Sequence, residues 1–145
     1  MKLTRACSYA LHALVYMSEH DPGGRRGLAS QEIARERGLP ERFLLKVLKP
    51  LVGAGILGSA RGPGGGYLLA RPLGEISLLD VVEAVEGPKY LLGGAPAIEQ
   101  TEDVATRQLD EQLQAISVQL GEKFRDRLRD VSLARLAGSS SKSKA

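Results

Sequence analysis

The sequence is poor in the residues that build covalent cross-links and metal centres. Among 145 residues there are one cysteine, Cys7, and two histidines, His12 and His20. A single thiol excludes a disulfide within the chain and an all-cysteine metal site within one subunit, and two histidines cannot complete a zinc finger. No apolar run approaches the ~18 residues that span a membrane, and no signal-peptide pattern opens the chain. These absences predict a soluble, cytoplasmic protein with little material for redox or metal chemistry.

What is present is ordinary for a globular domain, except that charge is unevenly distributed. Hydrophobic residues make up 43% of the chain and charged residues 26%, which is enough for one domain, or a small domain with an extension. Residues 1–75 carry 11 Lys and Arg against 6 Asp and Glu, whereas residues 76–138 carry 7 against 11. A basic first half joined to an acidic second half indicates a nucleic-acid-binding region fused to a different unit.

The first half has the pattern of two short helices joined by a tight turn, after an initial helix. Residues 3–18 predict a helix that is apolar on most faces. A second helix is expected to start with Ser30 as its N-cap and to stop at Gly38, and a third to begin near Pro40 and to bend or end early at Pro50. Its inward face is predicted to consist of apolar residues at helical spacing: Phe43, Leu44, Val47, Leu48 and Leu51.

A glycine-rich hairpin follows the helix pair. Residues 56–60 and 67–70 predict short strands on either side of the basic, glycine-rich residues 61–66, so the helix-turn-helix acquires a wing. The glycine run lacks the Lys-Ser/Thr pair of a phosphate-binding loop and lies between strands, which argues against nucleotide binding. Ser77 is expected to cap a further helix that runs through Val85.

The second half is dominated by one long predicted helix. Residues 89–100 predict a loop, residues 101–129 a helix, and residues 132–137 a last helical turn before a Ser/Lys-rich tail. One apolar seam runs along the helix: Leu109, Leu113, Ile116, Leu120 and Phe124. Such a seam needs a partner helix, most simply its own copy in a homodimer.

Together these elements predict a mainly α fold with a small β-hairpin. A winged helix-turn-helix domain is expected over residues 1–88, the loop over 89–100, a dimerisation helix and C-terminal turn over 101–137, and a disordered tail over 138–145. The third helix would enter the major groove of double-stranded DNA, with Glu41, Arg42 and Lys46 near base edges. The remaining predicted contacts grip the backbone: Ser30, Gln31, Lys49, Arg61, Gly64, Gly65, Gly66 and Tyr67. The alternative is that the cations form a solvated helix face.

Two residues of the first helix are candidates for sensing a signal. His12 shares a helical face with Tyr9 and Tyr16. It is either a ligand or a proton switch near a dimer interface or, as the pattern favours, a partly buried structural residue. Cys7 is expected to be inert unless a partner cysteine lies across a two-fold axis. Glu83 and Glu86 are interpreted as solvated, and no catalytic constellation is visible, so an enzyme is not expected.

Several segments resemble a family of bacterial regulators. They are the opening residues 1–4, Glu32-Ile33-Ala34 and residues 43–48, and above all residues 61–72 (RGPGGGYLLARP) followed by residues 75–88 (EISLLDVVEAVEGP). This combination is similar to the Rrf-two family of winged-helix transcription regulators, which includes iron–sulfur and nitric-oxide sensors of the IscR and NsrR type. The resemblance covers about residues 1–88 and agrees only in pattern beyond them.

The resemblance implies a homodimer whose long helices cross, with each subunit reading half of a near-palindromic operator. Members of this family that have a cofactor hold an iron–sulfur cluster with three cysteines in the loop before the long helix, but residues 89–100 contain none. We therefore expect no cofactor and no metal, and a cluster-free, dimeric repressor. The effector is open: a small molecule or protein acting on a pocket between the first helix, the loop and the long helix, or thiol chemistry at Cys7. The alternative function is a protein-interaction module that has lost operator binding.

Overall fold

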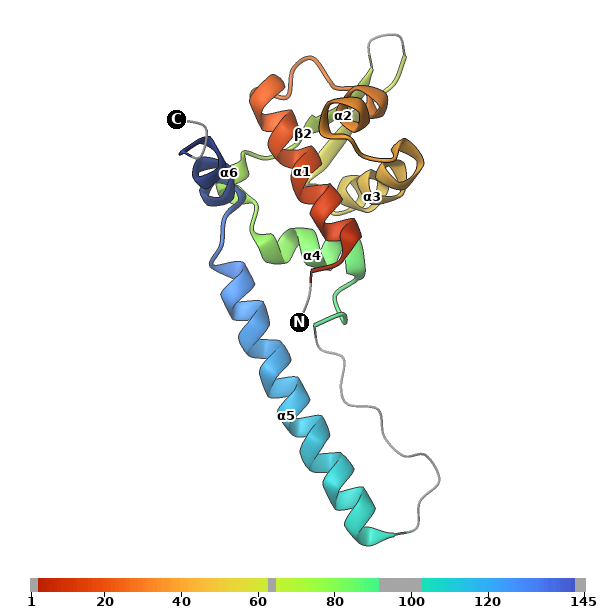
Figure 1. Ribbon diagram of the computed structural model, residues 1–145, viewed down its shortest axis with the longest axis vertical. Coiled ribbons are helices and arrows are strands. Elements are labelled where there is room, and N and C mark those ends of the chain that lie inside the picture. The colour runs from red at the N-terminus through yellow and green to blue at the C-terminus, as the bar shows by residue number, and fades with distance from the viewer. Residues whose placement is uncertain (1–2, 63–64, 92–102, 143–145) are drawn as a thin grey trace.

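Helices form nearly all of the structure, and one of them projects far from the rest. The computed structural model describes residues 3–62, 65–91 and 103–142. A body of helices and a hairpin lies at one end, and the longest helix extends away from it (Figure 1). The elements in chain order are α1 (Arg5–His20), α2 (Ser30–Arg37), α3 (Glu41–Gly53), β1 (Leu57–Ala60), β2 (Gly66–Leu69), the 3-10 turn η1 (Leu73–Glu75), α4 (Leu78–Glu86), α5 (Val104–Arg129) and α6 (Leu133–Lys142).

The first helix is the centre of the body. Thr4 caps α1 by accepting a hydrogen bond from the backbone N–H of Cys7 at 3.1 Å, so the helix begins and ends two residues later than the sequence predicted. Ala10, Leu14 and Met17 are buried, and α1 packs against α2, α3 and α4. A helix that contacts three neighbours needs apolar residues on most faces, as predicted.

The second and third helices form the expected helix-turn-helix with corrected boundaries. Ala29, not Ser30, is the N-cap of α2, and no side chain caps this end. Gly38 terminates α2 in the left-handed conformation, with φ +65°, which glycine adopts without steric cost. The predicted early end at Pro50 is wrong: α3 continues to Gly53, and Leu51 beyond the proline is fully buried.

The hairpin is attached to the body by its second strand. β1 and β2 are antiparallel, with Ser59 opposite Tyr67. On its other side Tyr67 exchanges two backbone hydrogen bonds with Leu28, both 2.8 Å long. The loop between α1 and α2 thus extends the two-stranded sheet by one bridge and holds the hairpin beside α3.

The C-terminal segment returns to the body after α5. The backbone N–H of Leu133 donates to the carbonyl of Ile76 at 2.9 Å, and that of Leu78 to the carbonyl of Val131 at 2.8 Å. Leu133 is fully buried in the main core. Where the sequence predicted a disordered tail from residue 138, α6 continues to Lys142; residues 143–145 lie outside the described residues. The last helix, α6, therefore packs against the N-terminal body.

The carboxylates of α4 are partnered, which corrects their interpretation as solvated residues. Ser77 and Asp80 form a reciprocal capping box at the start of α4. Glu83 pairs with Arg125 of α5 at 3.0 Å, and Glu86 accepts a hydrogen bond from the hydroxyl of Thr4. These contacts join α4 to both the first and the long helix. Across the described part of the chain, no helix has the length and apolarity needed to cross a bilayer.

Candidate DNA interface

The exposed face of α3 carries unpaired positive charge. Buried Leu44, Val47, Leu48 and Leu51 fix the helix against the core, which turns Arg42, Lys46 and Lys49 to the outside, and all three are exposed. We call these three residues the basic face. Within residues 3–62, 65–91 and 103–142, no carboxylate pairs with any of them.

Several other cations of the body are paired with carboxylates. Arg37 pairs with Glu19 at 2.9 Å, and Arg26 pairs with Glu32 at 3.2 Å. A cation without a protein partner can exchange its counterions for phosphates at low cost. The contrast makes the basic face the part of the helix-turn-helix best suited to an anionic polymer.

Two further predicted contacts lie at the start of α2, and one lies at the start of α3. Gln31 is exposed and Ser30 is half-buried, and no side chain caps the first-turn N–H groups. Those groups are open to a phosphate oxygen at the positive end of the helix. Glu41 occupies the first turn of α3 and is half-buried.

The hairpin glycines have a structural role that the sequence pattern does not reveal. A Cβ atom on Gly66 would lie 2.4 Å from the carbonyl oxygen of Leu28, and one on Gly65 would lie 2.4 Å from the carbonyl oxygen of Ala60. These glycines allow the hairpin to contact the protein's own backbone. These contacts within the protein explain why glycine is needed at both positions, so close approach to DNA is not required to explain it. Arg61 is exposed at the end of β1, and Gly64 lies outside the described residues.

A buried aspartate holds the loop that carries the hairpin bridge. The carboxylate of Asp21 accepts hydrogen bonds from the backbone N–H groups of Gly27 at 3.0 Å, Arg26 at 3.2 Å and Arg25 at 3.1 Å. Burial by itself raises the pKa of Asp21, but these donors outweigh it and hold the pKa below its usual range. No sequence pattern indicates this role, since the donors are backbone groups that the fold brings together.

Asp21→Asn is expected to lower stability at neutral pH, because the amide replaces a charged acceptor of three donors. A folded-state pKa below the unfolded value of about 3.9 contributes stability above that pH, which is lost as the pH falls through the folded value. Urea unfolding of the two proteins at pH 7 should therefore differ, and the difference should shrink below about pH 4. Asp130→Asn, at an exposed aspartate, is the control. If the two proteins differ in free energy of unfolding by the same amount at pH 7 and below about pH 4, the role of the ionised carboxylate is contradicted.

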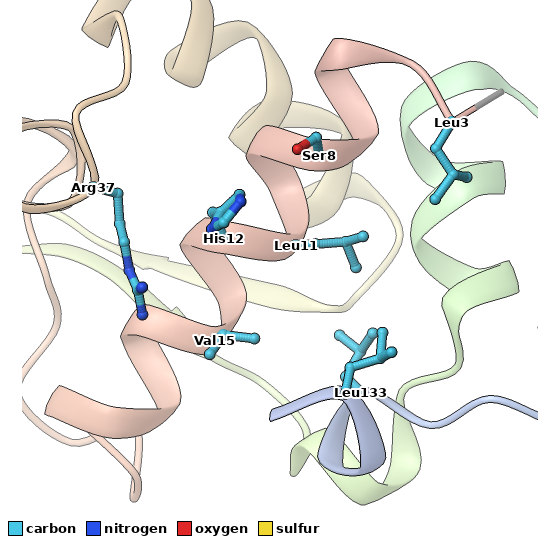
Figure 2. A pocket seen from close by; sticks show the side chains of 8 residues that line it. Leu3, Ser8, Leu11, His12, Val15, Arg37 and Leu133 are labelled. Carbon is cyan, nitrogen blue, oxygen red and sulfur yellow. The ribbon is translucent and has the colours of Figure 1, made fainter. Parts of the chain in front are cut away.

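A cavity lies beside α1. Its volume is about 420 Å³, and its walls come from α1, the end of α2 and α6. Leu11 and Val15 point toward Leu133 of α6 (Figure 2), whereas His12 and Arg37 supply polar groups. The sequence predicted that the loop and the long helix would also line this pocket. No described residue of α5 lines it, and residues 92–100 of the loop lie outside the described residues. Arg37, Leu133 and Leu136 were not anticipated, because they reach the cavity from segments far apart in the sequence.

The structure separates His12 from the tyrosines that were expected to accompany it. Tyr16 is buried and stacks on His20, with ring centroids 4.0 Å apart, and Tyr9 meets Phe43 edge-on at 5.3 Å. His12 is exposed, so its interpretation as a partly buried structural residue is wrong. Phe43 was predicted to face inward, and it is instead exposed beside Tyr9.

Cys7 is the least accessible of the candidate sensing residues. Its side chain is fully buried among Leu78, Leu79, Val82, Leu91 and Leu128. Burial raises the pKa of the thiol, so the reactive thiolate is depleted at neutral pH. The structure thus places the thiol where oxidants do not reach it without local opening.

Cys7 should therefore react more than about tenfold more slowly with a thiol reagent in the folded protein than in denaturant. The rate of reaction with Ellman's reagent measures this directly, because the chain has one thiol. Free glutathione under the same conditions corrects for the effect of denaturant on the reagent. Equal rates in the folded and unfolded protein would revive thiol chemistry as the sensing mechanism.

The apolar seam of α5 is exposed along its whole length. Leu109, Leu113, Ile116, Leu120 and Phe124 are 42–56% exposed. Near its C-terminal end α5 contacts α4, through the Arg125 ion pair and buried Leu128. The rest extends away from the body (Figure 1). A seam of this length, uncovered in a single chain, is the surface predicted for dimerisation.

The donor set of the chain does not fit an iron–sulfur cluster. Such clusters need several thiolates, whereas the chain supplies one, and its sulfur lies 3.9 Å from a Glu86 carboxylate oxygen inside the core. Among the residues that the structure describes, no three His, Cys, Asp or Glu side chains gather as metal ligands. The predicted absence of a cluster rests on this donor set.

Comparisons with known proteins give consistent results. The family model described as "Rrf2: Iron-dependent Transcriptional regulator" matches residues 3–139. The protein aau3 of Rhizobium meliloti is 42% identical over 86 residues, which are 59% of this chain and 54% of that protein. The HTH-type transcriptional regulator IscR of Cereibacter sphaeroides is 35% identical over 86 residues, 59% of this chain and 56% of the relative. This chain thus spans about half the length of these curated relatives.

A solved structure extends the similarity of fold to nearly the whole chain. CymR (YrzC), the global cysteine regulator of B. subtilis, superposes with a TM-score of 0.68 at 24% identity. The match covers 96% of this chain and 98% of CymR. The long helix and the segment after it, which resemble the family only in pattern, are therefore part of a shared architecture.

Proposed function

We propose, from the premise that the chain belongs to the Rrf2 family, that this protein is a sequence-specific DNA-binding transcription regulator rather than an enzyme. The observation that carries the proposal is the basic face of α3, whose three cations have no carboxylate partner among the described residues. In a helix-turn-helix the second helix lies in the major groove, where Arg42 and Lys46 are in position for base edges. Lys49, Arg61 and the start of α2 then grip phosphates on either side.

We further propose that the regulator is a homodimer that represses transcription in the cytoplasm. The seam of α5 supports the dimer, since five large apolar side chains at helical spacing are stabilised by burial against a copy of themselves. Two subunits related by a two-fold axis read a near-palindromic operator. Repression needs only DNA affinity, because occupancy of a promoter blocks it. The cavity beside α1 is the proposed site of an effector.

Arg42→Ala is the test of the basic face. The operator is first recovered by selecting duplexes from random-sequence DNA with the wild-type protein. The variant should bind the selected duplex about 1–3 kcal/mol more weakly, whereas its binding to random DNA should change much less. Arg127→Ala, which removes an exposed arginine near the end of α5, is the control and should retain affinity for the selected duplex.

The same measurements distinguish the alternatives. Equal losses on selected and random DNA would make Arg42 a phosphate contact. A wild-type selection that enriches no motif, with binding that depends only on salt, would contradict sequence-specific regulation and favour an interaction module.

A further inference from the structure

The basic face of α3 surrounds an exposed leucine. Leu45 lies three residues after Arg42, next to Lys46 and four residues before Lys49, so all four share one side of the helix. Its side chain is 38% exposed, and it belongs to neither cluster of core residues. The core is already filled by Leu44, Val47, Leu48 and Leu51. Leu45 is therefore not one of the residues that fill the core.

The surroundings of Leu45 open toward the hairpin. A hollow of about 370 Å³ is lined by Leu45, Lys49 and Val52 of α3 and by Ser59 and Tyr67 of the hairpin. The hairpin is fixed by the Leu28–Tyr67 bridge, so the hollow has a defined shape. Leu45 thus faces the space between the two elements that the proposed function brings to DNA.

The chemistry of the major groove limits what a leucine can recognise there. Base pairs present hydrogen-bond donors and acceptors at their major-groove edges, together with one apolar group, the C5-methyl of thymine. A leucine placed against donors or acceptors removes water from them without replacing its hydrogen bonds, which is unfavourable. Placed against a thymine methyl, it buries apolar surface on both sides. The long side chains of Arg42 and Lys49 reach outward from the same face, while the shorter leucine lies between them.

We propose that Leu45 is a specificity-determining residue that recognises the C5-methyl group of a thymine in each operator half-site. This inference rests on the proposed function, because it requires α3 to lie in the major groove. It adds that T·A is preferred at the position opposite the centre of the basic face. Cytosine is disfavoured there, because it offers the leucine no methyl group and presents an amino group that would lose its water.

The test removes the methyl group from DNA and the leucine side chain from the protein, separately and together. Deoxyuridine replaces thymidine, one symmetric pair of positions at a time, in the duplex selected by the wild-type protein. At one pair, wild-type affinity should fall about fourfold per half-site, the equivalent of ~0.8 kcal/mol for one buried methyl group. Leu45→Ala should bind the thymidine duplex more weakly and should show no further loss when deoxyuridine is placed at that pair.

Two controls separate this inference from the proposal on which it rests. Val104→Ala truncates an exposed apolar side chain, 59% exposed, at the start of α5, and should keep the full sensitivity to deoxyuridine. Thermal unfolding checks that Leu45→Ala remains folded, as expected for a residue outside the core. If wild-type protein selects a motif but no thymine responds to loss of its methyl, or if Leu45→Ala keeps the response, the role of Leu45 is overturned and DNA recognition stands. If no motif is selected, the proposed function itself fails.

Discussion

Ile116→Glu is expected to convert the protein to a monomer and to weaken binding to the two-half-site operator by about 10²–10⁴-fold. Ile116 is at the middle of the seam and is 53% exposed in the single chain. In a dimer of α5 helices the glutamate would lose its water in an apolar interface and face its own copy, which is strongly unfavourable. Light scattering coupled to gel filtration reports the mass, and titration of full-site and half-site duplexes reports the affinity.

Gln114→Glu is the matched control, because it places the same charge on the same helix. Each residue of a helix turns by about 100° around the axis, so Gln114 and Ile116, two residues apart, point to nearly opposite sides of α5. Gln114 is exposed. This variant should remain dimeric and bind the full site. Half-site affinity should be nearly unchanged in both variants. If Ile116→Glu stays dimeric with wild-type affinity, the seam is not the dimer interface.

Gly66→Ala is expected to destabilise the fold by about 3 kcal/mol, near the upper end for a single substitution. The new Cβ atom would lie 2.4 Å from the carbonyl oxygen of Leu28 and 2.6 Å from its carbonyl carbon. Neither atom can retreat without breaking the two 2.8 Å hydrogen bonds between Leu28 and Tyr67. Urea unfolding measures the loss. DNA affinity should fall as well, because the hairpin can no longer hold its place beside α3.

Gly53→Ala distinguishes this steric effect from a general effect of replacing glycine. Gly53 is the last residue of α3, and a Cβ atom there meets no atom within 4 Å. Alanine should stabilise this position by about 0.5–1 kcal/mol through its higher helix propensity. If Gly66→Ala unfolds within about 0.5 kcal/mol of the wild type, the hairpin accommodates a side chain and the bridge is not tight.

The local elements were predictable because their signals are local. Gly38 marked the end of α2, Ser77 the start of α4, and the glycine run the hairpin, each within one or two residues. The division of α3 into inner and outer faces was less accurate. Phe43 and Leu45 flank the buried Leu44 on the helical wheel, so periodicity alone does not decide which of them is covered. The packing of Tyr9 against Phe43 depends on the position of α1 relative to α3, and the spacing of residues in the sequence does not reveal that position.

The features that were missed depend on contacts between distant parts of the chain. Asp21 acts through backbone groups, which have no sequence signature. Leu133 enters the core because the chain turns back after α5, more than one hundred residues from the α1 residues that it joins. Hydrophobic spacing predicted the seam of α5 correctly as an apolar stripe, but only the structure shows that it is uncovered in the single chain.

The long helix is attached to the body near one end, and this makes it a lever. The Arg125–Glu83 pair and buried Leu128 fix the base of α5, and its 26 residues extend over about 39 Å at 1.5 Å per residue. A tilt of about 5° at the base therefore moves the far end by about 3 Å, a shift comparable to the rise of one base pair. Leu133, a wall of the cavity, lies a few residues beyond that base. In the proposed dimer, a displacement of α6 that tilts α5 would be amplified along the helix into a larger change in the separation of the two DNA-binding bodies.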